Sequence, residues 1–257
     1  MKIGFYDSGL GGTTVLNEAL KNIKADYYYF ADLLNSPYGT KTHEMVKEYA
    51  KNAIKILKNQ GCKVIVVACN TATSVAIKDL REENKDLVII GTEPAVKVAH
   101  DKNVNKDKKI IVTATSLTLK EEKLIKLIKR LDMKDQVILH PLDKLVYFAE
   151  SKDEIDHKSA LEYLKEDFLE YNFDKIESVV LGCTHFPLFK EDFKKVFGDK
   201  VNIYDGSVGI IKNLKSHIGN SCDKSTTITL ISSKDDGKIL NKFKKITSCN
   251  EVNFKVI

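Results

Sequence analysis

The sequence contains no tryptophan, few prolines and very little arginine. Its 257 residues include 4 prolines and 3 methionines, and arginine occurs only at positions 81 and 130. Base readout and bidentate phosphate binding favour arginine. The formal net charge is +5, but the lysines alternate with Asp and Glu along the expected helical faces. We therefore expect a solvated, lysine-biased surface and no nucleic-acid partner.

Long apolar runs are also missing. No run approaches the ~20 consecutive apolar residues that a membrane-spanning helix needs. The N-terminus, Met1–Asp7, goes straight into a predicted strand and carries no signal-peptide pattern. With 43% hydrophobic and 30% charged residues, the composition is that of an ordinary globular protein. These features predict a cytoplasmic protein that makes no membrane contact.

The cysteines show no disulfide or metal-binding pattern. They lie at positions 62, 69, 183, 222 and 249, an odd number without framework spacing, so free thiols are expected. There is no CxxC and no HExxH, and no metal site is predicted. We interpret Cys62, Cys222 and Cys249 as inert core residues, because buried cysteine commonly packs as a small hydrophobe.

Strand and helix patterns alternate along the whole chain. Strands are predicted over 2–6, 26–32, 86–91, 109–114, 136–140, 177–182, 200–204, 226–232 and 253–257, with a further strand leading into Cys69. Helices are predicted over 13–23, 43–59, 73–83, 120–131, 159–171, 190–197, 207–218 and 237–247, with another ending near 100. Such alternation with short loops indicates an α/β fold with mainly parallel sheets and right-handed crossovers.

The pattern repeats, which predicts two similar α/β sandwich domains related by pseudo-twofold symmetry. The first domain would comprise residues 1–95 together with 208–257, because the first half lacks strands that the C-terminal segment can supply. The second would comprise residues 96–207. Ligands bind at the carboxyl ends of strands in open α/β sheets. We expect the active site in a cleft between the domains, with the strand ends facing each other.

Two stretches are built alike and carry the strongest chemical signal. Val64–Ser74 and Val179–Leu188 each run from an apolar strand through a small residue to a cysteine and a polar turn. A helix starting just after each cysteine would present its positive dipole end to a thiolate. We therefore treat Cys69 and Cys183 as candidate reactive thiols rather than core residues.

Thiols on two opposed sheets suggest one type of reaction. With a small carbon acid between them, one thiolate can remove a proton while the other thiol returns one to the opposite face. Reacting atoms approach to about 3–3.5 Å, so the sulfurs would lie on the order of 7 Å apart. The result is inversion of a stereocentre, and no cofactor is required.

Other polar residues flank both cysteines. His185 is two residues from Cys183, and Asp7 ends the first strand, where it can serve Cys69. An ordinary thiol has a pKa of about 8.5, so such helpers are needed to tune it. Uncharged groups that can bind a carboxylate and an ammonium are Ser8, Asn70, Thr71 and Thr184.

The glycine-rich turn at residues 8–12 needs its own interpretation. It is similar to a dinucleotide-binding loop, but Thr14 stands where the third glycine of GxGxxG belongs, and no P-loop lysine follows. A glycine turn that lets a small ligand approach the backbone fits better than nucleotide binding.

Together these motifs resemble glutamate racemase, of the aspartate/glutamate racemase superfamily. The resemblance covers essentially the whole chain and rests on Asp7-Ser-Gly-Leu-Gly-Gly12, Pro37-Tyr-Gly39, Ala68-Cys-Asn-Thr-Ala72 and Gly182-Cys-Thr-His-Phe-Pro187. It implies cofactor-independent interconversion of L- and D-glutamate, which supplies D-glutamate for peptidoglycan. It also implies the two-domain α/β architecture, with the C-terminal segment rejoining the first domain, and a homodimer.

The resemblance also implies residue roles. Cys69 would be the base for D-glutamate and Cys183 the base for L-glutamate, with Asp7 and His185 assisting. The substrate-binding residues would be Asp7, Ser8, Pro37, Tyr38, Gly39, Asn70, Thr71, Thr118, Thr184 and His185. Two segments depart from the family pattern. Pro141–Glu150 is longer and more charged, so no role is carried over to Glu150, and Leu119–Glu121 replaces small and aromatic residues after Thr118.

Three alternatives remain open. The chain could be an aspartate or broad-specificity racemase of the same superfamily, which a substrate panel would distinguish. It could be a non-catalytic amino-acid-binding homologue, which would bind glutamate without exchanging the α-proton. A cysteine hydrolase using Cys183 and His185 fits less well, because residues so close in sequence rarely provide the separate base that a triad requires.

Overall fold

The structure is a computed structural model that describes residues 1–151, 154–218, 225–235 and 237–257. Cys222, interpreted above as an inert core residue, lies outside the described residues. The chain divides into two compact units. Unit 1 comprises Met1–Thr92 and Ser207–Ile257, and unit 2 comprises Glu93–Gly206.

Unit 1 is built on a six-stranded sheet in the order β10-β9-β2-β1-β3-β4. Every neighbouring pair is parallel. The strands are β1 (Lys2–Asp7), β2 (Asp26–Ala31), β3 (Val64–Val67), β4 (Val88–Gly91), β9 (Thr227–Ser232) and β10 (Asn253–Val256). The C-terminal segment joins this sheet because β9 pairs with β2 along its full length.

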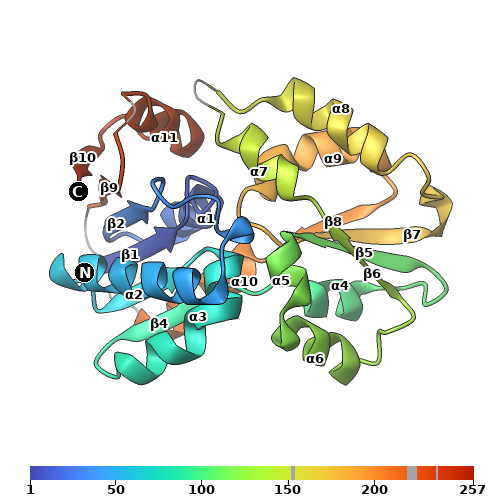
Figure 1. Ribbon diagram of the computed structural model, residues 1–257, viewed down its shortest axis with the longest axis horizontal. Helices are drawn as coiled ribbons and strands as arrows, with labels where there is room; N and C mark the ends of the chain where they lie inside the picture. Colours follow the sequence, from blue (N-terminus) through green and yellow to red (C-terminus); the bar gives the residue numbers. More distant parts are fainter. Residues whose placement is uncertain (152–153, 219–224, 236) are drawn as a thin grey trace. The chain divides into compact units, whose positions relative to one another are not determined.

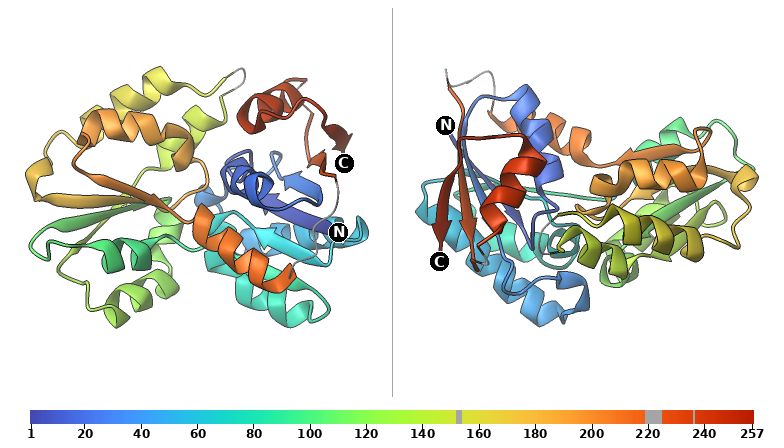
Figure 2. Two further views of the ribbon diagram at one scale, coloured as in Figure 1. Left: turned by 180° about the vertical axis from the view of Figure 1, so that it is seen from behind. Right: turned by 90° about the horizontal axis from the view of Figure 1, so that it is seen from above.

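Helices cover both faces of the unit 1 sheet. They are α1 (Thr13–Asn22), α2 (His43–Asn59), α3 (Asn70–Glu83), α10 (Ser207–Ile218) and α11 (Ile239–Thr247), with the 3-10 turn η1 (Tyr38–Thr40). Strand β1 shows why both faces must be covered by helices, because its successive side chains point to opposite sides of the sheet. Ile3 and Phe5 pack in a core with α1, whereas Gly4 lies against Leu57 of α2. Figure 2 shows α10 in front of the strands in the view from behind.

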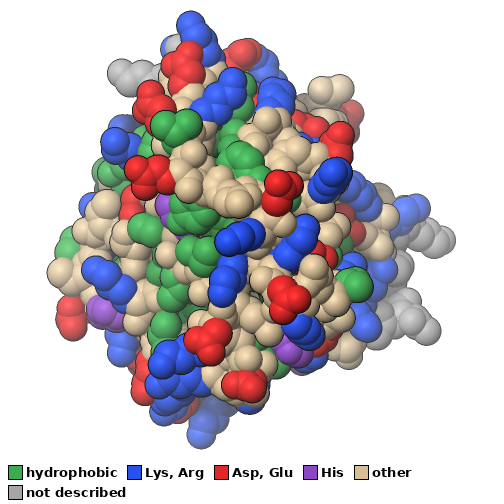
Figure 3. Space-filling view, turned by 90° about the vertical axis from the view of Figure 1, so that its right-hand side faces the viewer, with side chains coloured by type: hydrophobic (Ala, Val, Ile, Leu, Met, Phe, Trp, Pro, Cys, Tyr) green, Lys and Arg blue, Asp and Glu red, His purple; other side chains and the backbone are tan. Residues whose placement is uncertain are grey.

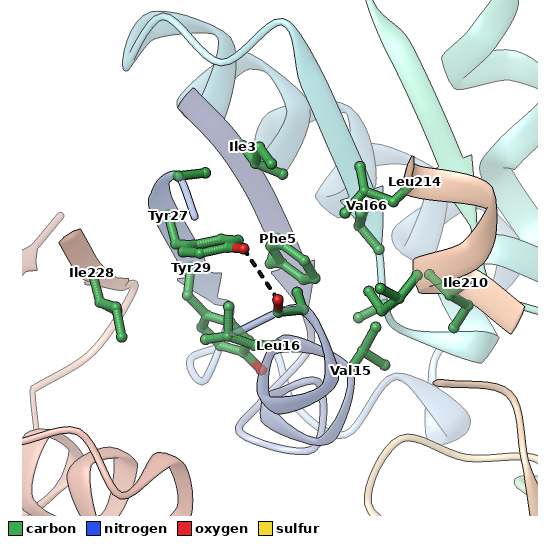
Figure 4. Packing of buried hydrophobic residues seen from close by; sticks show 14 of the residues in the cluster. Ile3, Phe5, Val15, Leu16, Tyr27, Tyr29, Val66, Ile210, Leu214 and Ile228 are labelled. Carbon is green, nitrogen blue, oxygen red and sulfur yellow. Dashed lines mark hydrogen bonds between the residues drawn. The ribbon is translucent and has the colours of Figure 1, made fainter. Parts of the chain in front are cut away.

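The core between the sheet and helices α1, α10 and α11 is drawn in Figure 4. Aromatic rings from β1 and β2 fill its centre. The ring centroids of Phe5 and Tyr27 lie 5.8 Å apart, and the two ring planes are inclined at 59°. Tyr27 is fully buried, yet its hydroxyl donates to the carbonyl oxygen of Ile23 at 2.8 Å. A buried hydroxyl without such an acceptor would cost about 1–3 kcal/mol. The ring therefore contributes apolar area without leaving a buried polar group unpaired.

Unit 2 is built on a four-stranded parallel sheet in the order β6-β5-β7-β8. Its strands are β5 (Lys109–Ala114), β6 (Val137–Pro141), β7 (Ile176–Leu181) and β8 (Asn202–Asp205). Each of the two central strands carries a run of three consecutive apolar residues, 110–112 and 179–181, as expected for a parallel sheet buried on both faces. Val179 and Leu181 belong to one core cluster, whereas Val180 belongs to the cluster on the opposite face.

Helices again lie on both faces of this sheet. They are α4 (Val96–Lys102), α5 (Ser116–Lys120), α6 (Glu122–Arg130), α7 (Asp143–Ala149), α8 (His157–Asp167) and α9 (Lys190–Phe197), with 3-10 turns η2 (Phe173–Lys175) and η3 (Phe186–Phe189). Figure 1 shows α7, α8 and α9 on one side of the strands and α4 and α6 on the other. The predicted α/β class, with parallel sheets in two domains, is confirmed.

Two parts of unit 2 differ from the prediction. The helix expected over 120–131 is α6 (Glu122–Arg130), and the short helix α5 (Ser116–Lys120) before it was not predicted; Glu121, whose ψ of 132° is extended, separates the two. Helix α7 was not predicted at all. Its apolar residues Leu145, Val146 and Ala149 are buried against the sheet. Because α7 is only 7 residues long, its helical period is too brief to stand out among charged neighbours.

The molecular surface shown in Figure 3 carries both signs of charge. Lysine and arginine side chains are interspersed with Asp and Glu across this face. In the part of the chain that the structure describes, no helix has the length and apolarity needed to cross a bilayer.

Candidate active site

Cys69 lies at the start of a helix in unit 1. It is the N-cap of α3, and its Sγ accepts a hydrogen bond from the backbone N–H of Ala72 at 3.4 Å. The side chain is buried, with 4% of the residue exposed. Helix α3 begins at Asn70 rather than at the predicted Thr73, because the sulfur itself caps the first turn. Backbone N–H groups and the helix dipole at this end favour a thiolate over a thiol.

Two other predicted residues lie at the carboxyl end of β1, beside the Cys69 strand. The Cys69 thiol donates to Ser8 Oγ at 3.8 Å. Asp7 is fully buried, and its Oδ2 accepts from the N–H of Gly9 at 3.1 Å. A Cβ on Gly12 would lie 2.7 Å from the Asp7 Cβ and 3.0 Å from the Ala68 Cβ. Glycine at position 12 therefore lets the turn pack against both strand ends.

Asn70 and Thr71 form the first turn of α3 directly after Cys69, and both are buried. Asn70 Oδ1 is buried and has no hydrogen-bond partner among the residues that the structure describes. Buried amide oxygens are normally paired. This oxygen can accept a hydrogen bond from a ligand donor such as an ammonium group.

The predicted segment Pro37–Gly39 enters η1 of unit 1. The Tyr38 side chain is buried, and its hydroxyl donates to Asp32 Oδ2 at 2.6 Å while accepting from the Tyr6 hydroxyl at 2.7 Å. Burial, together with nearby Tyr6 and Asp32, raises the pKa of Tyr38 far above its usual value. The side chain of Tyr38 therefore stays protonated and is engaged within unit 1. Sequence reasoning missed Asp32 and Tyr6, because neither lies in a recognisable motif.

Cys183 follows the carboxyl end of β7 in unit 2, with 7% of the residue exposed. The preceding Gly182 donates its N–H to the carbonyl oxygen of Thr113 at 2.7 Å. A Cβ on Gly182 would lie 2.7 Å from the same oxygen, closer than real Cβ atoms approach. Position 182 must therefore be glycine for the backbone to pass close to Thr113 and place Cys183 at the end of the strand.

His185 links Cys183 to a carboxylate. Its Nδ1 lies 3.7 Å from Cys183 Sγ, and its Nε2 lies 2.6 Å from Glu150 Oε1. The ring is 2% exposed, and burial by itself would lower the pKa of His185. The hydrogen bonds to Cys183 and Glu150 outweigh burial and raise the pKa well above its ordinary value. A protonated ring can donate to both neighbours, and its positive charge then lies beside the Cys183 sulfur.

Glu150 is a residue to which sequence reasoning assigned no role. It is the C-cap of α7, the helix that the sequence did not reveal. The sequence feature that could have indicated helix α7 was the apolar spacing of Leu145, Val146 and Ala149, which is followed directly by Glu150. Recognising it would have required knowing that His185 lies beside the end of this helix.

Two predicted threonines lie near Cys183 or at a neighbouring strand end. Thr184 is 4% exposed and immediately follows the thiol. Thr118, 2% exposed, belongs to α5, which begins just after the carboxyl end of β5. Its Oγ1 is 3.0 Å from Oγ1 of Thr115, the N-cap of α5. Because β5 pairs with β7, these hydroxyls and Cys183 lie at the same edge of the unit 2 sheet.

One expectation about the two cysteines is wrong. No α-helix begins directly after Cys183, because the residues that follow form the 3-10 turn η3, and α9 starts only at Lys190. The N–H of Phe186 donates to the Cys183 carbonyl at 3.1 Å, which closes a tight turn instead of a helical one. A helix N-terminus therefore supports Cys69, whereas an imidazole supports Cys183.

A resident metal ion is not suggested by the described side chains. Within the described ranges, no three or more His, Cys, Asp or Glu residues form a group that could hold a metal ion. The cysteines described are all free thiols, with Cys62, Cys69 and Cys183 buried and Cys249 half-buried. Burial raises the pKa of Cys62 to about 12, despite the charge of nearby Lys2.

Comparison with known proteins places this geometry in a family. Residues 7–211 match the family model described as Asp/Glu/Hydantoin racemase. The chain is 47% identical to glutamate racemase 2 of Bacillus subtilis strain 168 over 253 residues, covering 96% of this chain and 95% of that protein. It is 46% identical to glutamate racemase of Campylobacter concisus over 220 residues, covering 85% of this chain and 83% of that protein.

A solved structure agrees with the sequence comparisons. The fold matches that of glutamate racemase isoform RacE1 from Bacillus anthracis with a TM-score of 0.85 at 25% identity, covering 99% of this chain and 96% of that chain. The resemblance found in the sequence motifs is thereby confirmed. The chain belongs to the Asp/Glu/Hydantoin racemase family, within which it is similar to the glutamate racemases, and it is an isomerase of the racemase type.

Proposed function

We propose that this protein is a cofactor-independent glutamate racemase that interconverts L- and D-glutamate with Cys69 and Cys183 as its two bases. One observation carries the proposal. Each unit has a buried cysteine at the carboxyl end of a central parallel strand, held by groups that favour the thiolate. The similarity to glutamate racemases over nearly the whole chain supports glutamate as the substrate.

The proposed reaction moves protons only. Cys183 thiolate removes the Cα proton of L-glutamate, which breaks the C–H bond and forms S–H. The electron pair left on Cα is delocalised into the adjacent carboxylate. The Cys69 thiol then gives its proton to the opposite face of Cα, which leaves Cys69 as thiolate and yields D-glutamate. The reverse direction exchanges the two roles, and no atom is oxidised or reduced.

Each thiol has its own assistants in this proposal. Asp7 and Ser8 lie at the strand end beside Cys69, and His185 lies beside Cys183 with Glu150 behind it. General acid–base groups of this kind contribute about 10²–10⁴-fold when their proton affinity suits the working pH. We propose that Glu150 acts as a positioning residue, because it contacts His185.

The substrate would be held mainly by uncharged groups. These are Ser8, Asn70, Thr71, Thr118, Thr184 and the segment Pro37–Gly39, with Asp7 and His185 close to the reacting carbon. Asn70 Oδ1, buried and without a described partner, would accept from the substrate ammonium. Because the Tyr38 hydroxyl is already bonded to Asp32, the backbone at Tyr38 and Gly39 would meet the substrate. Hydroxyl and amide groups can bind carboxylates without arginine.

The biological setting follows from the same proposal. D-glutamate formed in the cytoplasm would supply peptidoglycan synthesis, and the protein would act as a homodimer. A solved relative of the same fold, from Francisella tularensis, is described in complex with D-glutamate. That complex supports a small amino acid as the ligand here.

The test is racemisation in D₂O without any added cofactor. Purified protein is incubated with L-glutamate, and the product is analysed by circular dichroism, chiral chromatography and mass spectrometry. The proposal expects D-glutamate that carries one deuterium at Cα. A matched control is Cys62→Ala, which removes a buried thiol of unit 1 that has no proposed role and should retain full activity.

Other outcomes would identify another function. Faster turnover of aspartate in a panel of both enantiomers would indicate an aspartate or broad-specificity racemase. Binding of glutamate by calorimetry, with no exchange of its α-proton, would indicate a non-catalytic amino-acid-binding protein. Either result would overturn the proposal as stated.

A further inference from the structure

Two neighbouring strand ends in unit 2, those of β5 and β6, lie at the start of helix α7. Strand β6 ends at Pro141, which pairs with Ala114 at the end of β5, and β5 pairs with β7. The N–H of Leu142 donates to the carbonyl oxygen of Ala114 at 3.0 Å. This contact places Asp143, the first residue of α7, beside the first residue of α5.

Asp143 uses both carboxylate oxygens on a single neighbour. Its Oδ1 accepts from the backbone N–H of Ser116 at 3.0 Å, and its Oδ2 accepts from the Ser116 hydroxyl. Ser116 is the first residue of α5, so its N–H has no acceptor within that helix. A carboxylate at this end also interacts favourably with the dipoles of α5 and α7. Asp143 therefore ties the starts of two helices together.

Helix α5 depends on such a contact. It is 5 residues long, far shorter than the 12–15 residues that an isolated helix needs for marginal stability. Thr115 caps it by accepting from the Thr118 N–H at 3.4 Å, and the two threonine hydroxyls are 3.0 Å apart. Both threonines are buried. The position of these hydroxyls is therefore set by whatever fixes the first turn of α5.

We infer that Asp143 is a positioning residue, which holds Ser116 and thereby fixes the Thr118 hydroxyl for substrate binding. This inference rests on the proposed function, in which Thr118 contacts glutamate. Asp143 does not itself touch the substrate in this account. Its distinctive feature is its location in Pro141–Glu150, the segment that departs from the family pattern.

The same helix also reaches the second thiol. Asp143 is the first residue of α7, and Glu150, which caps the other end, binds His185 beside Cys183. The two ends of helix α7 thus contact two parts of the site: Asp143 contacts the start of α5, and Glu150 contacts His185 beside Cys183. Loss of the Asp143 contact should disturb substrate binding more than the chemistry, because Glu150 and His185 remain in place.

The experiment compares kinetic constants of variants in both directions of the reaction. For Asp143→Ala we expect KM for glutamate to rise about tenfold, because both Ser116 bonds are lost, while kcat changes by less than about threefold. Asp143→Asn should restore most of the affinity. Its Oδ1 still accepts from the Ser116 N–H, and its amide can donate to the Ser116 hydroxyl.

The matched control is Asp156→Ala. Asp156 caps α8 in the same unit by accepting from the Ser159 N–H at 3.0 Å, a bond of the same kind and length. Its removal should leave KM unchanged. Unchanged KM in Asp143→Ala, or an equal rise in both variants, would overturn the inference.

A second measurement keeps this inference separate from the proposed function. Amide hydrogen exchange over residues 116–120 should accelerate in Asp143→Ala and remain normal in Asp156→Ala, whatever the substrate is. Unchanged exchange in α5 would overturn the positioning contact. A wild-type protein that does not racemise glutamate, yet shows the accelerated exchange in Asp143→Ala, would overturn the proposed function and the role given to Thr118, but not the contact.

Discussion

Cys69 and Cys183 occupy corresponding positions in their units but are supported by different chemistry. Cys69 caps an α-helix and has the Ser8 hydroxyl at 3.8 Å, so a helix N-terminus and an uncharged group contact its sulfur. Cys183 precedes a 3-10 turn, and its sulfur lies beside His185, which in turn contacts Glu150. Two ionisable side chains therefore support this thiol. Equivalent strand ends can thus carry thiols that are tuned in unequal ways.

This difference has a consequence for pH. A helix dipole does not titrate, whereas the charge on His185 does. The environment of Cys183 should therefore change with pH as His185 loses its proton. The proposed mechanism nevertheless uses both thiols in every turnover. A change in the environment of either thiol must consequently alter the rate of racemisation in both directions.

Removal of either thiol should give the largest effect. We expect Cys69→Ala and Cys183→Ala each to reduce racemisation by at least about 10³-fold, because a positioned acid or base is lost. The double variant should be little worse than either single one, since the two thiols act as a unit. Chiral chromatography measures the rate, with Cys62→Ala as the control. Substantial racemisation by either single variant would contradict the two-base mechanism.

Glu150→Gln should have the next largest effect. The variant keeps the shape of the side chain but loses the carboxylate charge beside His185. We expect kcat/KM to fall roughly tenfold to a hundredfold, less than on removal of a thiol base itself. The equilibrium constant between enantiomers is one, so kcat/KM must fall equally in both directions. Initial rates from L- and D-glutamate measure this. Glu154→Gln, which removes a carboxylate charge four positions further along the chain, is the control and should retain wild-type rates.

The same variant should alter how stability depends on pH. Because the pKa of His185 is raised in the folded state, its proton stabilises the fold fully below the ordinary value of about 6.5. That stabilisation is lost as pH rises through the raised pKa. Wild type and Glu150→Gln should therefore differ most in unfolding free energy near pH 6.5 and converge at higher pH. A difference that stays constant with pH would exclude His185 as its source.

Ser8→Ala should have the smallest effect. It removes one uncharged partner of Cys69, a hydrogen bond of about 0.5–1.5 kcal/mol, while the N-terminus of α3 remains. We expect kcat/KM to fall by a factor of a few, with no change in the pH dependence of unfolding. A loss as large as that in Glu150→Gln would show that the Cys69 side relies on side chains as much as the Cys183 side.

The sequence was sufficient for the parts of the fold governed by local pattern. Apolar runs identified the central strands, and the helix at His43–Asn59 was predicted to the residue. Helices α5 and α7 were missed because 5 and 7 residues give too little periodicity to stand out. Local pattern therefore predicts long elements and fails at short ones.

The candidate site shows the same division. Motifs led to Cys69, Cys183, Asp7 and His185, since each lies at or beside the end of a recognisable strand. Glu150 and Asp143 act through contacts with residues distant in the chain, at separations of 35 and 27 positions. Such partners are determined by strand pairing and helix packing, which a single sequence does not reveal.

The separate support of the two thiols is tested most directly by the rate at which iodoacetamide labels each of them. Labelling, read peptide by peptide at one fixed pH, would be measured in wild type and in Glu150→Gln. We predict that Cys183 is labelled more slowly in the variant, because His185 is less often protonated beside its sulfur, while the labelling rate of Cys69 is unchanged. Equal slowing of both thiols, or no change in either, would contradict the separate support of the two thiols.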